Sequence, residues 1–171
     1  FLPNGSWEFD TTNATTDGNS HDECQFDGQT YHDIWFLYEA CGDGELVVST
    51  CNTADYDTDL VLYERDCFGA LLTCNDDAEG CEIYTSEVST SVSEGDIVLI
   101  RVGGWNDDSQ GTGTLTITGP DADCGPEPCD GDFNGDGVVN VDDILEVVAG
   151  FGTAYGVDDL LLVLERFGTS C

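Results

Sequence analysis

Residues Asp132–Asp143 constrain the fold of this chain most strongly, because their oxygen-bearing side chains recur at fixed spacings. Side-chain oxygens fall at positions 1, 3, 5, 9 and 12 of the segment, glycine occupies position 6, and a valine carbonyl is available at position 7. A hard cation such as calcium takes about six to eight oxygens, and this is the ligand rhythm of an EF-hand loop. The segment predicts a calcium site formed by Asp132, Asn134, Asp136, Val138, Asn140 and Asp143.

The same amphipathic pattern then occurs twice, at Val141–Phe151 and, sixteen residues later, at Val157–Phe167. Each copy opens with acidic residues and ends near a glycine, as helices commonly do. Only Thr153–Gly156 stand directly before the second copy, so the oxygens at its loop positions 1, 3 and 5 are missing. We therefore expect a small helix pair that holds one calcium ion.

The charge of the chain excludes several classes of partner. It contains 36 acidic residues against three arginines, with no lysine, for a formal net charge of -33. Binding to phosphates needs clustered Lys and Arg, so nucleic acid and anionic membrane surfaces are excluded. No apolar run of about 18 residues occurs, so we expect no membrane insertion. Such a chain repels itself, and bound divalent cations would relieve the repulsion.

Nine cysteines in 171 residues indicate an oxidising, extracellular compartment. The chain starts at Phe1 without an initiator methionine, which is typical of a secreted product whose leader has been removed. We expect a secreted or cell-surface protein. No C-x-x-C pair occurs, so disulfides are favoured over zinc ligation.

Residues 1–119 predict an all-β domain, residues 120–128 a Pro/Gly-rich linker, and residues 129–171 the helical module. Short runs rich in Val, Ile, Thr and Tyr alternate with Gly/Asp/Asn turns, which indicates an antiparallel sandwich or jelly roll. The expected strands are Ile34–Ala40, Glu45–Thr50, Leu60–Glu64, Leu71–Thr73, Ile83–Val92, Ile97–Val102 and Thr114–Thr118. The alternating Ser6–Thr12 segment either pairs within its own domain or adds a strand to a neighbour.

Strand geometry restricts the pairing of the cysteines. If the first two expected strands form a hairpin, a strand of six residues separates Cys41 from Cys51 by roughly 18–20 Å, too far for a bond. Following the strands up and down places Cys41 beside Cys67, which predicts that pair. Further expectations are that Cys24, Cys51, Cys74 and Cys81 pair among themselves, that Cys129 bonds Cys171, and that Cys124 is the odd thiol.

Two acidic loops, Asp55–Asp59 and Asn75–Asp77, would meet at the end of the domain that holds Cys51 and Cys74. Carboxylates crowded in this way either have raised pKa values or hold a cation. The sequence leaves a second calcium site and a solvated acidic rim both open. The candidate ligands are Asp55, Asp57, Asp59, Asn75, Asp76 and Asp77, with Asp107 and Asp108 as weaker candidates.

No motif in the chain indicates catalysis. His21 and His32 each lie beside acids, but neither G-x-S-x-G nor H-E-x-x-H occurs, so we expect no enzyme. Trp105, in the loop G-G-W-N-D-D, is the best placed aromatic residue for contact with a sugar. Asn4 and Asn13 fit the N-x-S/T glycosylation pattern.

Two family resemblances follow from these motifs. The D-F-N-G-D-G-V-V-N-V-D-D-I-L run resembles the duplicated calcium loop and helix of dockerin modules over residues 129–171. Dockerins bind cohesins through both repeats, and the degenerate second loop moves the expectation away from that role. The runs Y-D-T-D-L-V-L-Y, C-N-D-D, I-R-V-G-G and G-T-G-T-L-T-I resemble the bacterial pre-peptidase C-terminal β-sandwich over roughly residues 14–119. That resemblance implies an accessory, non-catalytic domain of a secreted bacterial protein.

Together these features predict a non-enzymatic, calcium-binding structural protein, such as a glycosylated subunit of an extracellular fibril or matrix. Its partners would be further copies of itself or another extracellular protein, with a glycan as a candidate ligand. The alternative is a glycan- or protein-binding accessory module of a larger secreted hydrolase.

Overall fold

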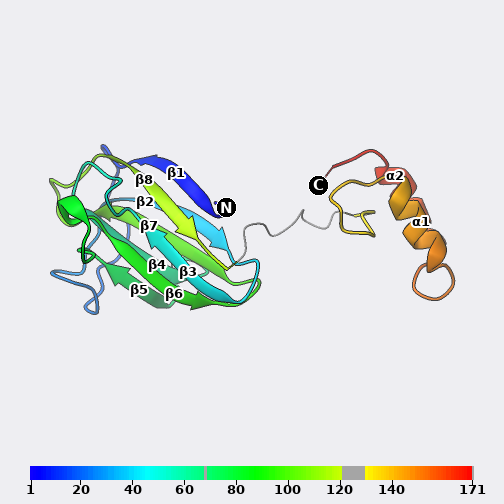
Figure 1. Cartoon of the computed structure of the whole chain (residues 1–171), viewed down its shortest axis with the longest axis horizontal. Coiled ribbons are helices and arrows are strands. Elements are labelled where there is room, and N and C mark those ends of the chain that lie inside the picture. The colour runs from blue at the N-terminus through cyan, green and yellow to red at the C-terminus, as the bar shows by residue number, and fades with distance from the viewer. Residues whose placement is uncertain (68, 121–129, 171) are drawn as a thin grey trace. The chain divides into compact units, whose positions relative to one another are not determined.

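The computed structural model describes residues 1–67, 69–120 and 130–170. The chain divides into two compact units, Phe1–Asp123 and Cys124–Cys171, which we call the sandwich unit and the helical unit (Figure 1). Within the described ranges, no helix is both long and apolar enough to span a membrane.

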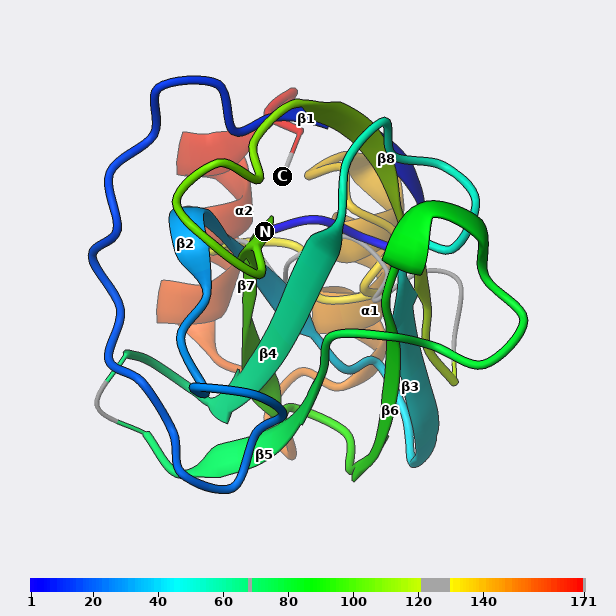
Figure 2. The same cartoon turned by 90° about the vertical axis from the view of Figure 1, so that its left-hand side faces the viewer.

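The sandwich unit contains two antiparallel four-stranded sheets, which confirms the predicted fold class (Figures 1 and 2). One sheet has the order β1-β8-β3-β6 and the other has the order β2-β7-β4-β5. The strands are β1 (Gly5–Asp10), β2 (Tyr31–Glu39), β3 (Gly44–Ser49), β4 (Thr58–Glu64), β5 (Leu71–Asn75), β6 (Glu87–Val92), β7 (Ile97–Gly104) and β8 (Thr112–Thr118).

Alternation along the strands sends apolar side chains into the space between the sheets. In β3, Leu46 and Val48 are fully buried while their strand neighbours are partly or fully exposed. Strand β4 departs from this pattern, because six of its seven residues are buried. Its outward-facing Val61 and Tyr63 pack with Leu99 and Trp35 in a second, smaller cluster.

A buried arginine holds the N-terminal loop to the sheet that contains β4. The guanidinium of Arg101 in β7 has no exposed surface and forms a salt bridge of 2.5 Å with Asp33. It also donates to the backbone carbonyls of Asn19 and Thr30 at 2.8 Å. A buried charge is tolerated only when it is paired and hydrogen-bonded. This network therefore fixes the loop before β2 on the sheet.

The first strand pairs within its own domain. Residues Gly5–Asp10 lie antiparallel to Thr112–Thr118 of β8, so the Ser6–Thr12 segment needs no neighbouring chain as its partner. Just before this strand, the Asn4 side chain accepts a hydrogen bond from the Gly119 N–H at 2.7 Å. Asn13 is exposed.

Two strand predictions were wrong. Strands β2 and β3 do not form a hairpin, because β2 pairs with β7 and β3 pairs with β6 and β8 in the opposite sheet. The expected Ile83–Val92 strand starts only at Glu87. Its first residues form a 3₁₀ turn, Glu82–Tyr84, in which Ile83 and Tyr84 have φ values of 56°. The left-handed backbone at these residues ends any strand there.

Four cysteines pair among themselves, as predicted, in the bonds Cys24–Cys74 and Cys51–Cys81. The predicted Cys41–Cys67 bond was wrong, because Cys41 is disulfide-bonded whereas Cys67 is an exposed free thiol. Cys41 follows β2 and Cys67 follows β4, and the two strands finish at the same end of the sheet. Strand β7 lies between them. Two strand spacings are about 9–10 Å, beyond the roughly 7 Å reach of a disulfide. The predicted pairing of Cys129 with Cys171 and the predicted odd thiol at Cys124 involve residues outside the described ranges.

The helical unit contains α1 (Val141–Ala149) and α2 (Val157–Arg166), where the repeated pattern predicted helices. Val139, Val147 and Val163 form its buried core, with Phe133 and Tyr155 packed against it in an edge-to-face contact. The core is small for an independently stable domain.

Candidate functional site

The loop Asp132–Asp143 folds around the carboxylate of its first residue. One oxygen of Asp132 accepts the N–H groups of Gly135 (2.8 Å) and Asp136 (3.2 Å), and the other accepts that of Gly137 (2.9 Å). Gly135 and Gly137 have φ values of 75° and 83°, which glycine adopts at no steric cost.

Asp143, the last residue of the loop, ties both ends of the loop to the start of α1. One of its oxygens accepts the N–H groups of Phe133 (2.8 Å) and Asn134 (3.1 Å), and the other accepts that of Asn140 (2.8 Å). Asp143 is completely buried. Burial alone would raise the pKa of its carboxyl, but these backbone hydrogen bonds outweigh burial and lower that pKa. The carboxylate at this position is therefore held in its charged form.

The remaining predicted ligands line the turn between these two carboxylates. Asn134 accepts the Asp136 N–H at 2.9 Å, and Asp136 accepts the Val138 N–H at 2.9 Å. The Asn140 side-chain NH₂ group donates to the Val138 carbonyl at 3.1 Å. The Asn140 side-chain oxygen caps α1 by accepting a hydrogen bond from the Asp142 N–H. The six predicted residues thus belong to one series of turns, in which backbone N–H groups of the same loop donate to the side-chain oxygens.

The second repeat keeps only part of this arrangement. At the start of α2, Asp159 accepts the Gly156 N–H at 2.7 Å, as Asp143 accepts that of Asn140 at the start of α1. The segment between the helices holds its turn through bonds to the Gly150 carbonyl, including one from the Thr153 hydroxyl at 2.9 Å. The helix cap is duplicated, and the oxygen-rich loop is not.

In the sandwich unit, the two acidic loops meet at one end of the β4–β5 pair. Leu60 of β4 lies opposite Asn75 of β5. Asp57, which directly precedes β4, therefore lies next to Asp76 and Asp77, which directly follow β5. One carboxylate oxygen from each of these three residues lies within 4.8 Å of the others. Across the described ranges, this is the only group of three or more His, Cys, Asp or Glu ligands that gathers so closely.

The other three predicted ligands have different partners. Asp55 accepts the Thr112 N–H at 2.8 Å and its hydroxyl at 3.1 Å. Asp59 is buried and accepts the Thr30 hydroxyl at 2.6 Å. The Asn75 side chain accepts the Glu87 N–H and donates to Gln25. Asp55 and Asp59 therefore lie outside the close group of three carboxylates, whereas the Asn75 side chain also donates to the Asp77 backbone carbonyl at 3.3 Å.

The cluster is electrostatically strained. Burial, followed by repulsion from Asp59, Asp57 and Asp77, raises the pKa of Asp76 to about 8. Burial, followed by repulsion from Asp77 and Asp59, raises the pKa of Asp57 to about 6. Burial also raises the pKa of Asp59 to about 6, although the Thr30 hydroxyl and Arg101 act to lower it. The loop carboxylate of Asp143 has a pKa shifted in the opposite direction.

Three aromatic side chains line a pocket of about 290 Å³ together with the three carboxylates of the cluster. Trp105, the predicted sugar contact, directly follows β7, whose last residue pairs with the start of β4. Phe26 packs edge-on against Trp105 with ring centroids 5.7 Å apart. The sequence did not predict Phe26 and Tyr84 at this site, because disulfides bring their segments to this end of the sandwich.

Both histidines hold loops in place. His32 directs one ring nitrogen to the Ala14 carbonyl and the other to the Asp107 carbonyl, each at 2.8 Å. These two bonds raise the pKa of His32, because only the protonated ring can donate from both nitrogens. His21 lies 2.9 Å from the Tyr63 hydroxyl. Asp108, a weaker candidate calcium ligand, lies two residues after Asn106, whose side-chain oxygen accepts the Asp108 N–H at 2.7 Å.

The helical unit exposes a repeated row of apolar side chains. On α1, Val141, Leu145 and Val148 are 55–58% exposed. Residues at the same positions of the repeat on α2 are exposed to a similar degree, and they are Val157, Leu161 and Leu164. Each set follows the i, i+4, i+7 spacing of one helical face. We call these two sets the apolar stripes of α1 and α2.

No protein-family model matches the chain, and no curated protein matches it.

Proposed function

We propose that this chain is a non-enzymatic, calcium-dependent assembly protein of the extracellular space, in which calcium at the Asp132–Asp143 loop fixes the helical unit. The observation that carries the proposal is the loop itself, with oxygens at EF-hand spacing and its first and last carboxylates turned inward. Calcium ligands of this kind are oxygens from a short folded-back loop. The two disulfides of the sandwich unit are compatible with an extracellular location.

The apolar stripes supply the contact surface in this proposal. Monomeric proteins rarely expose contiguous apolar patches without a partner. The helical unit carries the same stripe twice, so one chain has two equivalent surfaces for other copies. Two contact surfaces per subunit are the minimum needed for an extended assembly, whereas one surface gives a closed dimer. Calcium would also offset the charge that otherwise keeps such acidic chains apart.

The assembly is tested by size-exclusion chromatography and negative-stain imaging with calcium and with EGTA. We expect oligomers or filaments in calcium and monomers in EGTA. Leu145→Ser removes one stripe and should limit assembly to small oligomers, and the Leu145→Ser/Leu161→Ser double variant should be monomeric. Leu72→Ser, at an exposed leucine of the sandwich unit, is the control and should assemble normally. A wild-type chain that is monomeric under both conditions contradicts the assembly proposal.

The pocket lined by Phe26, Tyr84 and Trp105 favours a second candidate function, glycan binding by the sandwich unit. Aromatic faces combined with a few polar groups in a concave site are typical of small-ligand pockets. A glycan array tests this candidate, with Trp105→Ala expected to abolish binding. Trp7→Ala, at a tryptophan outside the pocket, is the matched control.

A further inference from the structure

The acidic cluster of Asp57, Asp76 and Asp77 lacks an internal counter-charge. In the part of the chain that the structure describes, the two salt bridges involve Asp33 and Asp130, and neither reaches a carboxylate of the cluster. Arg101, the cation of β7, uses its donors on Asp33, Tyr63 and the N-terminal loop. The three crowded carboxylates therefore face one another without a basic side chain to neutralise them.

Among the residues that the structure describes, two buried oxygens of the cluster also have no hydrogen-bond partner. Asp76 is only 6% exposed, and its Oδ1 atom has no donor. The Oδ1 atom of Asp57 is buried and unpartnered as well. Native structures leave few buried polar atoms unsatisfied, because an unmade hydrogen bond costs about 1–3 kcal/mol and more for a charged group. The unsatisfied oxygens indicate a ligand that lies outside the protein chain.

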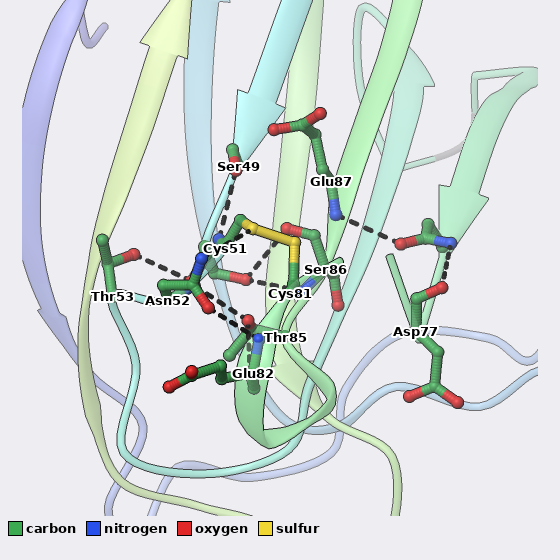
Figure 3. Close-up of a disulfide and its surroundings, with 12 residues drawn as sticks. Ser49, Cys51, Asn52, Thr53, Asp77, Cys81, Glu82, Thr85, Ser86 and Glu87 are labelled. Carbon is green, nitrogen blue, oxygen red and sulfur yellow. Dashed lines mark hydrogen bonds between the residues drawn. A yellow bond between two sulfur atoms is a disulfide. The ribbon is translucent and has the colours of Figure 1, made fainter. Parts of the chain in front are cut away.

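The surrounding structure holds these residues rigidly in place. The Gln25 side chain accepts the Asp76 N–H at 3.0 Å, and the adjacent Cys24–Cys74 bond fixes that loop to β5. On the other side, the Ser86 hydroxyl donates to the Asp76 carbonyl at 2.6 Å, near the Cys51–Cys81 bond. Figure 3 shows the Asp77 carboxylate pointing away from that disulfide. A site built on two disulfides and a strand pair is preorganised, which lowers the cost of binding.

We propose that Asp57, Asp76 and Asp77 bind a calcium ion at the wall of the aromatic pocket. Three carboxylates supply about three to six of the roughly six to eight oxygens that calcium takes, and water or a pocket ligand completes the shell. The oxygen-only ligand set does not suit zinc, which prefers nitrogen and sulfur, and magnesium demands near-ideal octahedral geometry. This site lies in the sandwich unit, so it is independent of the Asp132–Asp143 loop and of the proposed assembly.

Terbium luminescence tests the site directly, because Tb³⁺ replaces calcium in oxygen sites and emits when a nearby tryptophan is excited. All three tryptophans belong to the sandwich unit, and Trp105 lines the pocket beside the carboxylates. Tryptophan-selective excitation of the EGTA-stripped full chain should give strong terbium emission that calcium displaces. Asp132→Ala, which disables the loop in the helical unit, should leave this emission unchanged.

Substitutions at the cluster decide the assignment. Asp76→Asn keeps the side-chain shape and removes a strained buried charge, so the variant should fold, and its emission should fall at least tenfold. Asp57→Asn should behave in the same way, whereas Glu79→Gln, at an exposed acid of the neighbouring loop, should match the wild type. Trp105→Phe should lose the emission and retain calcium binding by calorimetry. Wild-type emission that is absent, or that persists in both folded Asp→Asn variants, would overturn the proposal.

Discussion

The sandwich unit packs sixteen buried apolar residues into one core between its sheets, whereas the core of the helical unit contains three. Between its described residues, the sandwich unit also has two disulfides and a fully buried ion pair. The helical unit relies instead on a buried carboxylate that caps a helix and closes a loop. From this difference we expect the sandwich unit to fold without a ligand, and we propose that the helical unit needs an ion or a partner to be stable.

Calcium removal should separate the two units most clearly. With EGTA, we expect α1 and α2 to lose most of their hydrogen-exchange protection, because a metal that binds only the folded state stabilises it by mass action. Amides of β4 and β7 should remain protected, since their core does not include the loop. Hydrogen exchange followed by mass spectrometry measures both regions in one sample. Equal protection of the helices with and without calcium would contradict the comparison.

The next largest difference should lie in how much the ion pair of each unit contributes to its free energy of unfolding. Arg101→Met leaves Asp33 buried without its cation, so we expect a loss of about 3–5 kcal/mol from the free energy of unfolding of the sandwich unit. Arg166→Met removes an exposed contact of 3.9 Å with Asp130 and should cost less than about 1 kcal/mol in the helical unit. Urea unfolding monitored by tryptophan fluorescence and by helical circular dichroism gives the two values. Similar losses in the two variants would contradict this ranking.

The two units should also show an opposite dependence on pH in the absence of metal. The pKa values of Asp59 (about 6) and Asp76 (about 8) lie above their ordinary value of 3.8, so these groups bind protons more tightly when folded. Their stabilising contribution is complete below pH of about 4 and is lost as pH rises through about 6 and then 8. The lowered pKa of Asp143 works in reverse, and its contribution is lost as pH falls below about 4.

Thermal melting in EGTA between pH of about 3 and 9 checks these signs, with tryptophan reporting the sandwich unit and circular dichroism reporting the helices. Repulsion across the whole acidic chain also grows with pH, so Asp76→Asn serves to isolate the cluster. This variant should flatten the decline of the sandwich unit and leave the helical unit unchanged. An unchanged slope in Asp76→Asn would assign the decline to general repulsion.

Local patterns predicted much of this fold from the sequence. The duplicated Val141–Phe151 and Val157–Phe167 segments both became helices, since their periodicity and acidic first turns agree. The prediction of a β2–β3 hairpin was wrong, because a short connection can join two strands within one sheet or cross from one sheet to the other. Alternation shows which side chains face the core, and it does not show which sheet a strand joins.

The acidic cluster was only partly predictable for a related reason. Antiparallel strands bring the residue before β4 to the residues after β5, so Asp57, Asp76 and Asp77 could be expected together. Phe26 and Tyr84 could not be placed, because four cysteines allow three pairings and each pairing moves these segments differently. Arg101 was visible only as one of three arginines, and its burial depends on tertiary contacts that no local pattern encodes.

The same burial of Arg101 has a consequence for proteolysis. Trypsin-like proteases cut after lysine or arginine, and this chain contains no lysine and three arginines. Arg101 has no exposed surface in the folded sandwich unit, so only Arg65 and Arg166 offer such enzymes a cleavage point. The side chain that anchors the N-terminal loop therefore also removes the one cleavage point that would cut a central strand.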